Sequence, residues 1–356
     1  MVNVLGLDIG GANTKAVYVK TKNGVILGGD VQVLVEYFPF WKNFEMLGHV
    51  LQKIREKLGG GFDVVGVTMT AELSDVYRTK REGVEHILSC VREVFFDVPV
   101  YVLNVNGSLE LVENALLWPL GVAAANWMAT GWLVAQYFEN CIVVDVGSTS
   151  TSIIPVINGK VAALGKTDLD KLIVGELVYT GSLRTNLAAI VQTVPVRDRV
   201  FSAVSSELFA LSGDMHLILG NIRGEQYTCE TADGKGVSRK EALTRLARLV
   251  CADTEMLTEE ELVKIAQYIY KKQIQQIAKG LSQVYKHVKE EVAAANVSII
   301  VTGLGKDFLA YRAVEEIVTS QTVIMDLSKL LPEKVSLAAP AVGVSLMTAK
   351  HLETEK

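Results

Sequence analysis

Two short stretches of the chain place an acid, glycine and small polar residues directly after an apolar run. The first is DIGGANTK, from Asp8 to Lys15, and the second is DVGSTST, from Asp145 to Thr151. Glycine lets backbone N–H groups approach an anion closely, and small hydroxyl or amide side chains add further donors. Each stretch could therefore bind phosphate, although a Gly-containing turn of this kind is also an ordinary way to reverse a chain.

The two stretches align residue by residue, which makes the phosphate interpretation stronger than one copy would. The residues expected to bind phosphate are Gly10, Gly11, Asn13 and Thr14 in the first copy and Gly147, Ser148 and Thr149 in the second. Both copies continue to an Asn-Gly pair, Asn23-Gly24 and Asn158-Gly159, before another apolar run. Asn-Gly between strands predicts a hairpin, and a repeated unit predicts two similarly folded halves. Two such loops at one cleft could hold a single polyanion.

A third glycine-rich element lies near the end of the chain. An apolar run from Ser298 to Thr302 meets Gly303-Leu304-Gly305, and a helix is expected from about Lys306 to Val318. Backbone N–H groups at the start of that helix could face a ligand. The same pattern also fits an ordinary turn between a strand and a helix.

Four charged residues could act on a phosphate group. Asp8 and Asp145 are expected to hold Mg²⁺ that bridges phosphate oxygens, although each could instead cap its own turn. Lys15 could neutralise a phosphate as a point charge, or it could be a solvated strand residue. Arg184, in the stretch YTGSLRTNL, could grip a carboxylate or phosphate with two hydrogen bonds. A surface salt bridge is the alternative for Arg184.

A proton acceptor is harder to identify from the sequence. Glu72 follows a strand expected over 62–71, and strand ends of α/β sheets lie beside ligand clefts. Asp214 and His216 are further candidates, but a lone histidine is more often structural. The basic run Arg239–Arg248 is expected to form the solvated face of a helix.

Length and composition predict a two-domain globular protein. The 356 residues divide into a first half over 1–135 and a second half over 136–356, the second carrying a mostly helical insertion at about 166–270. The formal net charge of −5 argues against nucleic-acid binding through a basic face. Scattered cysteines without a CxxC pair argue against zinc and disulfides, and favour a reducing cytoplasmic location.

Helical patterns complete the predicted elements. The apolar stretch Leu116–Phe138 is interrupted by Asn126 and Pro119, so it predicts a buried helix and not a membrane span, which needs roughly 18 uninterrupted apolar residues. A long helix is expected over Thr258–Ala294 and a late one over Ala338–His351.

The paired acidic hairpins and the later Gly-Leu-Gly resemble the acetate and sugar kinase, Hsp70 and actin superfamily. This resemblance implies an α/β actin-like ATPase fold with two duplicated ribonuclease H-like halves around a central cleft. More narrowly, TMTAELSD, YTGSLRTNL and SSELFALSGDMHLILG resemble the archaeal hydantoinase/oxoprolinase-like family of methanofuran and tetrahydromethanopterin-linked one-carbon metabolism.

That narrower resemblance implies a transferase and not a kinase. It implies condensation of 5-(aminomethyl)-3-furanmethanol diphosphate with γ-glutamyltyramine, so that an ether forms, diphosphate leaves and no ATP is consumed. The alternatives are an ATP-dependent kinase of a small metabolite, a hydantoinase-like hydrolase of the same fold, and a nucleotide-responsive binding module without turnover. No membrane partner is expected, and the sequence does not predict an oligomeric state.

Overall fold

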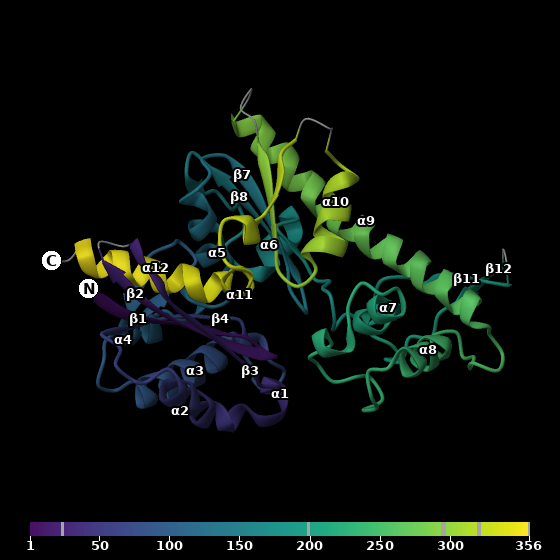
Figure 1. The fold of residues 1–356 in the computed structure, drawn as a ribbon, viewed down its shortest axis with the longest axis horizontal. Helices are drawn as coiled ribbons and strands as arrows, with labels where there is room; N and C mark the ends of the chain where they lie inside the picture. The colour runs from purple at the N-terminus through teal and green to yellow at the C-terminus, as the bar shows by residue number, and fades with distance from the viewer. Residues whose placement is uncertain (23–24, 198–199, 293–296, 319–321, 355–356) are drawn as a thin grey trace. The chain divides into compact units, whose positions relative to one another are not determined.

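The computed structural model describes residues 1–22, 25–197, 200–292, 297–318 and 322–354 (Figure 1). The chain divides into two compact units. Unit 1 comprises residues 1–140, 154–170 and 328–356, and unit 2 comprises residues 141–153 and 171–327. The expected division near residue 135 assigned the whole C-terminal part to the second half. The structure differs because helix α12 (Ala339–Thr354) packs on β1, β4 and α5, and so belongs to unit 1.

Unit 1 is built on a mixed sheet. Its strands are β1 (Val2–Ile9), β2 (Asn13–Lys22), β3 (Val25–Tyr37), β4 (Val64–Met69), β5 (Val100–Leu103) and β6 (Leu109–Leu111). They lie in the order β3-β2-β1-β4-β5-β6, in which β1, β4 and β5 are parallel and the remaining pairs are antiparallel. The expected strand after Asn23-Gly24 is present as β3, whereas the turn itself lies outside the described residues.

Successive side chains of β1 point to opposite faces of the sheet, and each face packs against different helices. Leu5, Leu7 and Ile9 belong to the apolar core that also contains side chains of α2 (Leu47–Lys57) and α3 (Lys80–Val94). Gly6 faces α12, where a Cβ on this residue would collide with the Ala341 carbonyl oxygen. Figure 1 shows α12 and α2 with α3 on opposite sides of this sheet. Glycine on one face thus allows α12 to lie directly on the strand backbone.

The predicted helix over Leu116–Phe138 is shorter in the structure. α4 (Val112–Leu117) ends before Pro119, where a short 3₁₀ turn begins, and Ala124 has a φ of 50°. A proline and a left-handed residue both interrupt a helix. The buried helix α5 therefore covers only Asn126–Ala135.

The second sheet repeats the strand order of the first. Its strands are β7 (Cys141–Val146), β8 (Thr151–Ile157), β9 (Lys160–Val161), β10 (Leu177–Val178), β13 (Ser298–Thr302) and β14 (Ile324–Asp326). They lie in the order β10-β8-β7-β13-β14, with β9 also paired to β8. β7, β13 and β14 are parallel, as are β1, β4 and β5. The repeat expected from two loops therefore extends to whole sheets.

The hairpin predicted at Asn158-Gly159 is confirmed, but its second strand is short. The two turn residues have φ values of 51° and 69°, as a type I′ turn requires. The strand expected over 161–164 ends at Val161. The edge of β8 is shared, since β9 pairs with its end and β10 pairs with Ser152 and Thr151 near its start.

The remaining elements of unit 2 surround a long helix. They are α6 (Asp168–Val174, which begins in unit 1), β11 (Thr193–Val196), β12 (Val200–Ala203), α7 (Ser212–Ile218), α8 (Arg239–Arg248), α9 (Glu259–Val292) and α10 (Tyr311–Glu315). α7, α8 and the β11–β12 hairpin lie at one end of α9 (Figure 1), where they share an apolar core that includes Met215, Leu246 and Ile265. The region expected to be mostly helical thus also contains a hairpin and long irregular segments.

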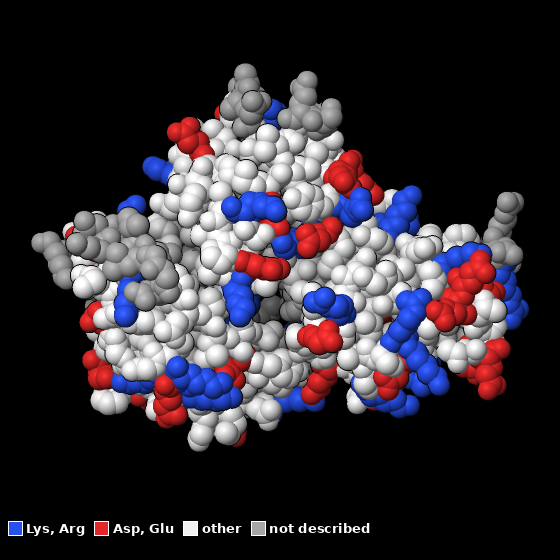
Figure 2. Space-filling view, viewed as in Figure 1, with Lys and Arg blue, Asp and Glu red and all other residues white. Residues whose placement is uncertain are grey.

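The surface carries charges of both signs. On the face drawn in Figure 2, Lys and Arg side chains are interspersed with Asp and Glu. Among the helices of the described residues, each is too short or too polar to cross a membrane.

Candidate functional site

The first acidic loop follows β1 in unit 1. Asp8 is 6% exposed and stands in register with Lys15 of β2 and Thr68 of β4, so these three side chains share one face of the sheet. The turn is closed by Gly10, whose N–H donates to the Asn13 carbonyl oxygen at 3.0 Å. A carboxylate and an ammonium group are thus placed on neighbouring strands at the start of the loop.

Aromatic residues cover this first loop. The Phe38 N–H donates to the Ala12 carbonyl at 3.0 Å, and the Phe40 N–H donates to the Gly11 carbonyl at 2.9 Å. Phe40 is fully buried, and its ring packs edge-on against Phe38 with centroids 5.5 Å apart. Thr14, expected to bind phosphate, is fully buried on the opposite face from Asp8. The cover of this loop is therefore part of the apolar core.

Glu72 lies just after β4, beside a half-buried lysine. Its carboxylate is fully buried and lies 3.6 Å from the Lys80 ammonium, which also pairs with Asp168 at 2.5 Å. Burial raises the pKa of Glu72 to about 7, in spite of the opposing charge of Lys80. Glu72 can therefore exchange a proton near neutral pH.

The second acidic loop follows β7 in unit 2 and repeats the turn of the first. The Gly147 N–H donates to the Ser150 carbonyl at 3.0 Å, in the same aligned positions as Gly10 and Asn13. Asp145 stands in register with Thr302 of β13, as Asp8 does with Thr68 of β4. The alignment read from the sequence therefore holds at the level of single hydrogen bonds.

Two polar residues and one buried apolar residue cover this second loop. The Ser182 N–H donates to the Gly147 carbonyl at 2.9 Å, and the N–H groups of Leu183 and Arg184 donate to the Ser148 carbonyl at 2.9 and 3.0 Å. The Arg184 guanidinium donates to the Thr149 hydroxyl at 3.3 Å. A cation is therefore held directly over a loop of small hydroxyl residues.

The third glycine-rich element closes the same group of residues. Gly303 has a φ of +87°, and a Cβ on this residue would lie 2.6 Å from the Asp145 Oδ1 atom. The Gly305 N–H donates to the Val146 carbonyl at 3.0 Å, and a Cβ here would lie 2.5 Å from the Ser182 hydroxyl. Only glycine permits this close approach. The predicted members brought together in unit 2 are Asp145, Gly147, Ser148, Thr149, Arg184, Gly303 and Gly305.

The helix expected after Gly305 is present in two parts. A π-helix covers Lys306–Ala310 and α10 continues to Glu315. π-helical turns are rare and frequently lie at functional sites. Lys306, at its start, forms a buried ion pair with Asp326 at the end of β14.

Asp214 and His216, the other candidate bases, are occupied in structural contacts. His216 is fully buried between Gln273 and Asn221, and burial lowers its pKa to about 3. Asp214 accepts two hydrogen bonds from Arg245 at 2.7 and 2.9 Å. The expectation that the basic run of α8 is a solvated face is wrong for Arg245, which is fully buried because Asp214 and Asp233 neutralise it.

Two residues of this site were not predicted. Ser182 is fully buried, and its hydroxyl finds no hydrogen-bond partner among the described residues. Gln273 of α9 is fully buried and contacts the segment that carries Arg184. Ser182 could have been found in the stretch YTGSLRTNL, which already drew attention to Arg184. Gln273 lies in an ordinary helical pattern and gave no signal.

In the described residues, a metal ion would meet at most two His, Cys, Asp or Glu side chains at one place. In the described ranges, no group of three or more His, Cys, Asp or Glu side chains is close enough to hold a metal ion. Mg²⁺ commonly takes only one or two carboxylates and completes its shell with waters and substrate phosphates. The single carboxylates of Asp8 and Asp145 fit that mode of binding.

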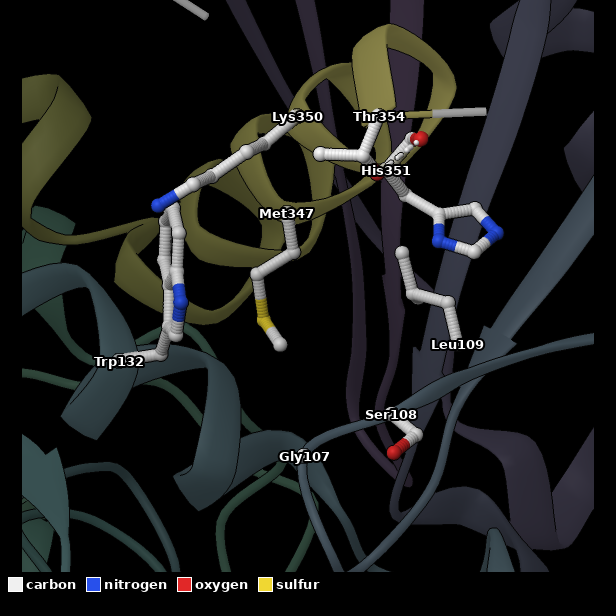
Figure 3. A pocket seen from close by; sticks show the side chains of 8 residues that line it. All are labelled: Gly107, Ser108, Leu109, Trp132, Met347, Lys350, His351 and Thr354. Carbon is white, nitrogen blue, oxygen red and sulfur yellow. Dashed lines mark hydrogen bonds between the residues drawn. The ribbon is translucent and has the colours of Figure 1, made fainter. Parts of the chain in front are cut away.

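A cavity of about 370 Å³ lies elsewhere in unit 1, at the end of α12 (Figure 3). Its lining includes Trp132, whose ring lies 5.8 Å from the Lys350 ammonium, together with Met347 and His351. The predicted site residues are absent from its lining. It is therefore distinct from both acidic loops.

Comparison with known proteins identifies the family. The hydantoinase/oxoprolinase family profile matches residues 63–351. The chain belongs to the hydantoinase/oxoprolinase family. Within it, the chain is 37% identical over 353 residues to the (4-{4-[2-(γ-L-glutamylamino)ethyl]phenoxymethyl}furan-2-yl)methanamine synthase of Methanocaldococcus jannaschii, with 99% of both chains covered. It is 36% identical over 217 residues to the synthase of the same name from Methanococcus vannielii, covering 61% of this chain and 94% of the relative.

The fold is also found among solved structures. The nucleotide-free structure of an acetone carboxylase aligns with 97% of this chain and 70% of its own, with a TM-score of 0.53 at 10% identity. Together with the repeated strand order, this similarity confirms the predicted α/β actin-like ATPase fold of the chain.

Proposed function

We propose that this chain is a transferase that joins a phenol to a furanylmethyl group and releases diphosphate. The observation that carries the proposal is the 37% identity, over 99% of the chain, to a relative whose name describes an ether product. That name contains a (furan-2-yl)methanamine and a γ-glutamylaminoethyl phenyl group, joined through phenoxymethyl. The proposed substrates are 5-(aminomethyl)-3-furanmethanol diphosphate and γ-glutamyltyramine.

The proposed chemistry breaks one carbon–oxygen bond and forms another. The bond between the furanylmethyl carbon and diphosphate breaks, and the electron pair leaves with diphosphate. The phenol oxygen then bonds to the same carbon, and its proton passes to a base. Because the furan ring delocalises the developing positive charge, the protein mainly has to stabilise the leaving group. The atoms and electrons of this reaction balance without a nucleotide.

Unit 2 supplies groups suited to a leaving diphosphate. Arg184 offers a guanidinium over the second loop, and Ser148 and Thr149 offer hydroxyl groups beside it. Ser182 adds a buried hydroxyl whose hydrogen-bonding capacity is not used within the described residues. Such groups are fixed before the charge develops, which is how electrostatic catalysis lowers a barrier.

Unit 1 supplies the second set of proposed contacts. Lys15 would neutralise negative charge, and the Gly11 N–H and the Asn13 side-chain amide would donate hydrogen bonds. Gly10 would keep the turn closed, because its N–H donates to the Asn13 carbonyl. We propose Asp8 and Asp145 as carboxylate contacts for Mg²⁺. When bound with diphosphate, Mg²⁺ would offset the charge of the leaving group.

Glu72 is the proposed acceptor of the phenol proton. A phenol has an unperturbed pKa near 10, so a base with a pKa of about 7 is well matched to it at neutral pH. Asp214 and His216 are unsuited to this task, since their polar atoms are already bonded to Arg245, Gln273 and Asn221.

One incubation tests the reaction. The purified protein is mixed with the furanylmethyl diphosphate, γ-glutamyltyramine and Mg²⁺, without ATP, and the ether and free diphosphate are quantified. We expect the two products in equal amounts. Product that forms only with ATP, together with ADP, would instead favour a kinase-like reaction, and ring opening without ether would favour a hydrolase.

Neutral variants of the two loop acids extend the test. Asp8→Asn and Asp145→Asn should each lower kcat by about 10²-fold or more, because each removes a proposed Mg²⁺ contact. Asp307→Asn is the control, since its carboxylate is 71% exposed and lies 4.0 Å from the Lys306 ammonium. Equal activity of all three variants would contradict the proposed roles of Asp8 and Asp145.

A further inference from the structure

The segment that carries Arg184 is tied to α9 by one buried amide. The Gln273 Nε2 group donates to the Gly181 carbonyl at 2.9 Å and to the Thr180 hydroxyl at 2.9 Å. The Gln273 Oε1 atom lies 3.0 Å from His216 Nε2. Gln273 and His216 are fully buried. A buried glutamine with both ends bonded contributes order instead of an unpaired polar group.

The positions of the protons in this chain of contacts follow from bonding rules. A backbone carbonyl can only accept, so the amide nitrogen of Gln273 must face Gly181 and its oxygen must face His216. His216 Nε2 therefore carries the proton. Its Nδ1 atom is left as an acceptor, and it lies 3.1 Å from the Nδ2 donor of Asn221. Gln273, His216 and Asn221 thus form a neutral hydrogen-bonded chain, called the relay below. In each of its contacts a donor faces an acceptor.

The relay ends on the backbone that precedes Arg184, and a second set of contacts holds the backbone that follows. The Gly181 N–H donates to the Thr185 hydroxyl at 2.9 Å, and the Thr185 N–H donates to the Ser212 hydroxyl at 3.1 Å. The Ser212 N–H donates in turn to the Thr185 carbonyl at 2.8 Å. Arg184 therefore lies between Gly181 and Thr185, whose backbones are both fixed by hydrogen bonds.

We propose that Gln273 and His216 are positioning residues that hold Arg184 over the anion bound at Ser148 and Thr149. This inference rests on the proposed function, in which that anion is diphosphate. Pre-ordering the Arg184 segment removes an entropic cost that binding would otherwise have to meet. Glutamine suits position 273 because a carboxylate there could not donate to the Gly181 carbonyl.

Pyrophosphate binding tests the inference without requiring turnover. We compare Gln273→Leu and Gln273→Glu with Gln276→Leu, a half-buried glutamine on the same helix that contacts Ile190. With Mg²⁺ present, calorimetry should show pyrophosphate affinity at least 10-fold weaker in both Gln273 variants and within 2-fold of the parent in Gln276→Leu. Equal affinities in all three variants would overturn the inference.

A double variant separates positioning from a general loss of stability. Arg184→Ala should weaken pyrophosphate binding at least 5-fold less in the Gln273→Leu protein than in the parent, because the guanidinium is already misplaced. Equal losses in the two backgrounds would mean that Gln273 does not act through Arg184.

Should Gln273→Leu fail to fold, Asn221→Ala removes the outer end of the relay at a half-buried position. We expect about 3-fold weaker binding, and parent affinity would overturn the inference.

Amide exchange distinguishes this inference from the proposed function. The amides of residues 181–185 should exchange at least 10-fold faster in Gln273→Leu than in Gln276→Leu, whether or not pyrophosphate binds. Equal exchange would overturn the inference alone. A parent protein that does not bind pyrophosphate, yet shows the exchange difference, would overturn the proposed diphosphate chemistry and leave the relay in place.

Discussion

In unit 1 the loop after β1 is covered by Phe38 and Phe40, whereas in unit 2 the loop after β7 is covered by Ser182, Leu183 and Arg184. In both units the covering segment follows the strand at one place in the sheet order, β3 or β10, and donates its N–H groups to loop carbonyls. The backbone contacts are thus alike, whereas Ser182 and Arg184 add polar side chains that the first cover lacks.

The difference shows which segment supplies the charged side chains near each loop. Backbone contacts depend on glycine and on strand order, so they survive replacement of the covering side chains. The first loop presents charge from its own strands, through Asp8 and Lys15, and uses its cover as core. The second loop receives a cation from its cover, through Arg184. Exchange of the covering residues should therefore affect stability in one unit and ligand binding in the other.

The largest expected effect is on stability in unit 1. Phe40→Ala should lower the free energy of unfolding by about 3–5 kcal/mol, because it removes a fully buried ring and leaves a cavity. Phe96→Ala in the same unit is the control, since this ring is 81% exposed. Denaturant unfolding measures both. Similar losses of unfolding free energy in the two variants would mean that Phe40, in the segment over the first loop, is not needed for the core of unit 1.

A catalytic effect is expected in unit 2. Arg184→Ala should lower kcat/KM by about 10²–10³-fold, the usual result of removing one preorganised group that stabilises transition-state charge. Its melting temperature should remain near that of the parent protein. Arg223→Ala, at a side chain that is 84% exposed, should change neither quantity. A large loss of stability in Arg184→Ala would show that this cover also serves as core.

The smallest effect concerns Glu72, whose burial raises its pKa from 4.5 to about 7. The folded protein binds this proton more tightly than the unfolded chain, so the resulting stability is complete below pH 4.5 and is lost as pH rises through 7. Glu72→Gln should therefore be about 1–3 kcal/mol more stable than the parent at pH 8 and equal to it at pH 4.

Activity of the same variant tests the proposed proton transfer. If Glu72 accepts the phenol proton, Glu72→Gln gains stability at pH 8 while losing ether formation. Denaturant unfolding at the two pH values and product assays at pH 8 give both answers. Unchanged activity would assign Glu72 to the Lys80 and Asp168 ion group alone.

Local patterns predicted much of this fold. The acidic turns, the Asn158-Gly159 hairpin and the long helix α9 were read correctly because each depends on residues close in sequence. The likeness of the two sheets followed from recognising the repeat. The limits of the Leu116–Phe138 helix were missed because Pro119 and Ala124 interrupt it, and the proline was visible in the sequence.

Contacts between distant residues were beyond reach. Arg245 looked solvated because Asp214, which neutralises it, stands 31 positions away in sequence. Gln273 gave no signal because it contacts Thr180 across 93 positions. The roles proposed for Asp8, Asp145 and Arg184 are predictions that substitution of these residues tests, and the role of Lys15 is a further prediction.

The packing of α12 on β1 also has a consequence for synthesis of the protein. The Ala341 carbonyl fits against Gly6, so β1 is covered by a helix that is synthesised more than 300 residues after it. On the ribosome, the face of the sheet that α12 covers stays exposed until α12 itself has emerged. Chaperones that shield apolar surface on nascent chains should therefore engage unit 1 for longer than a domain formed from one continuous segment.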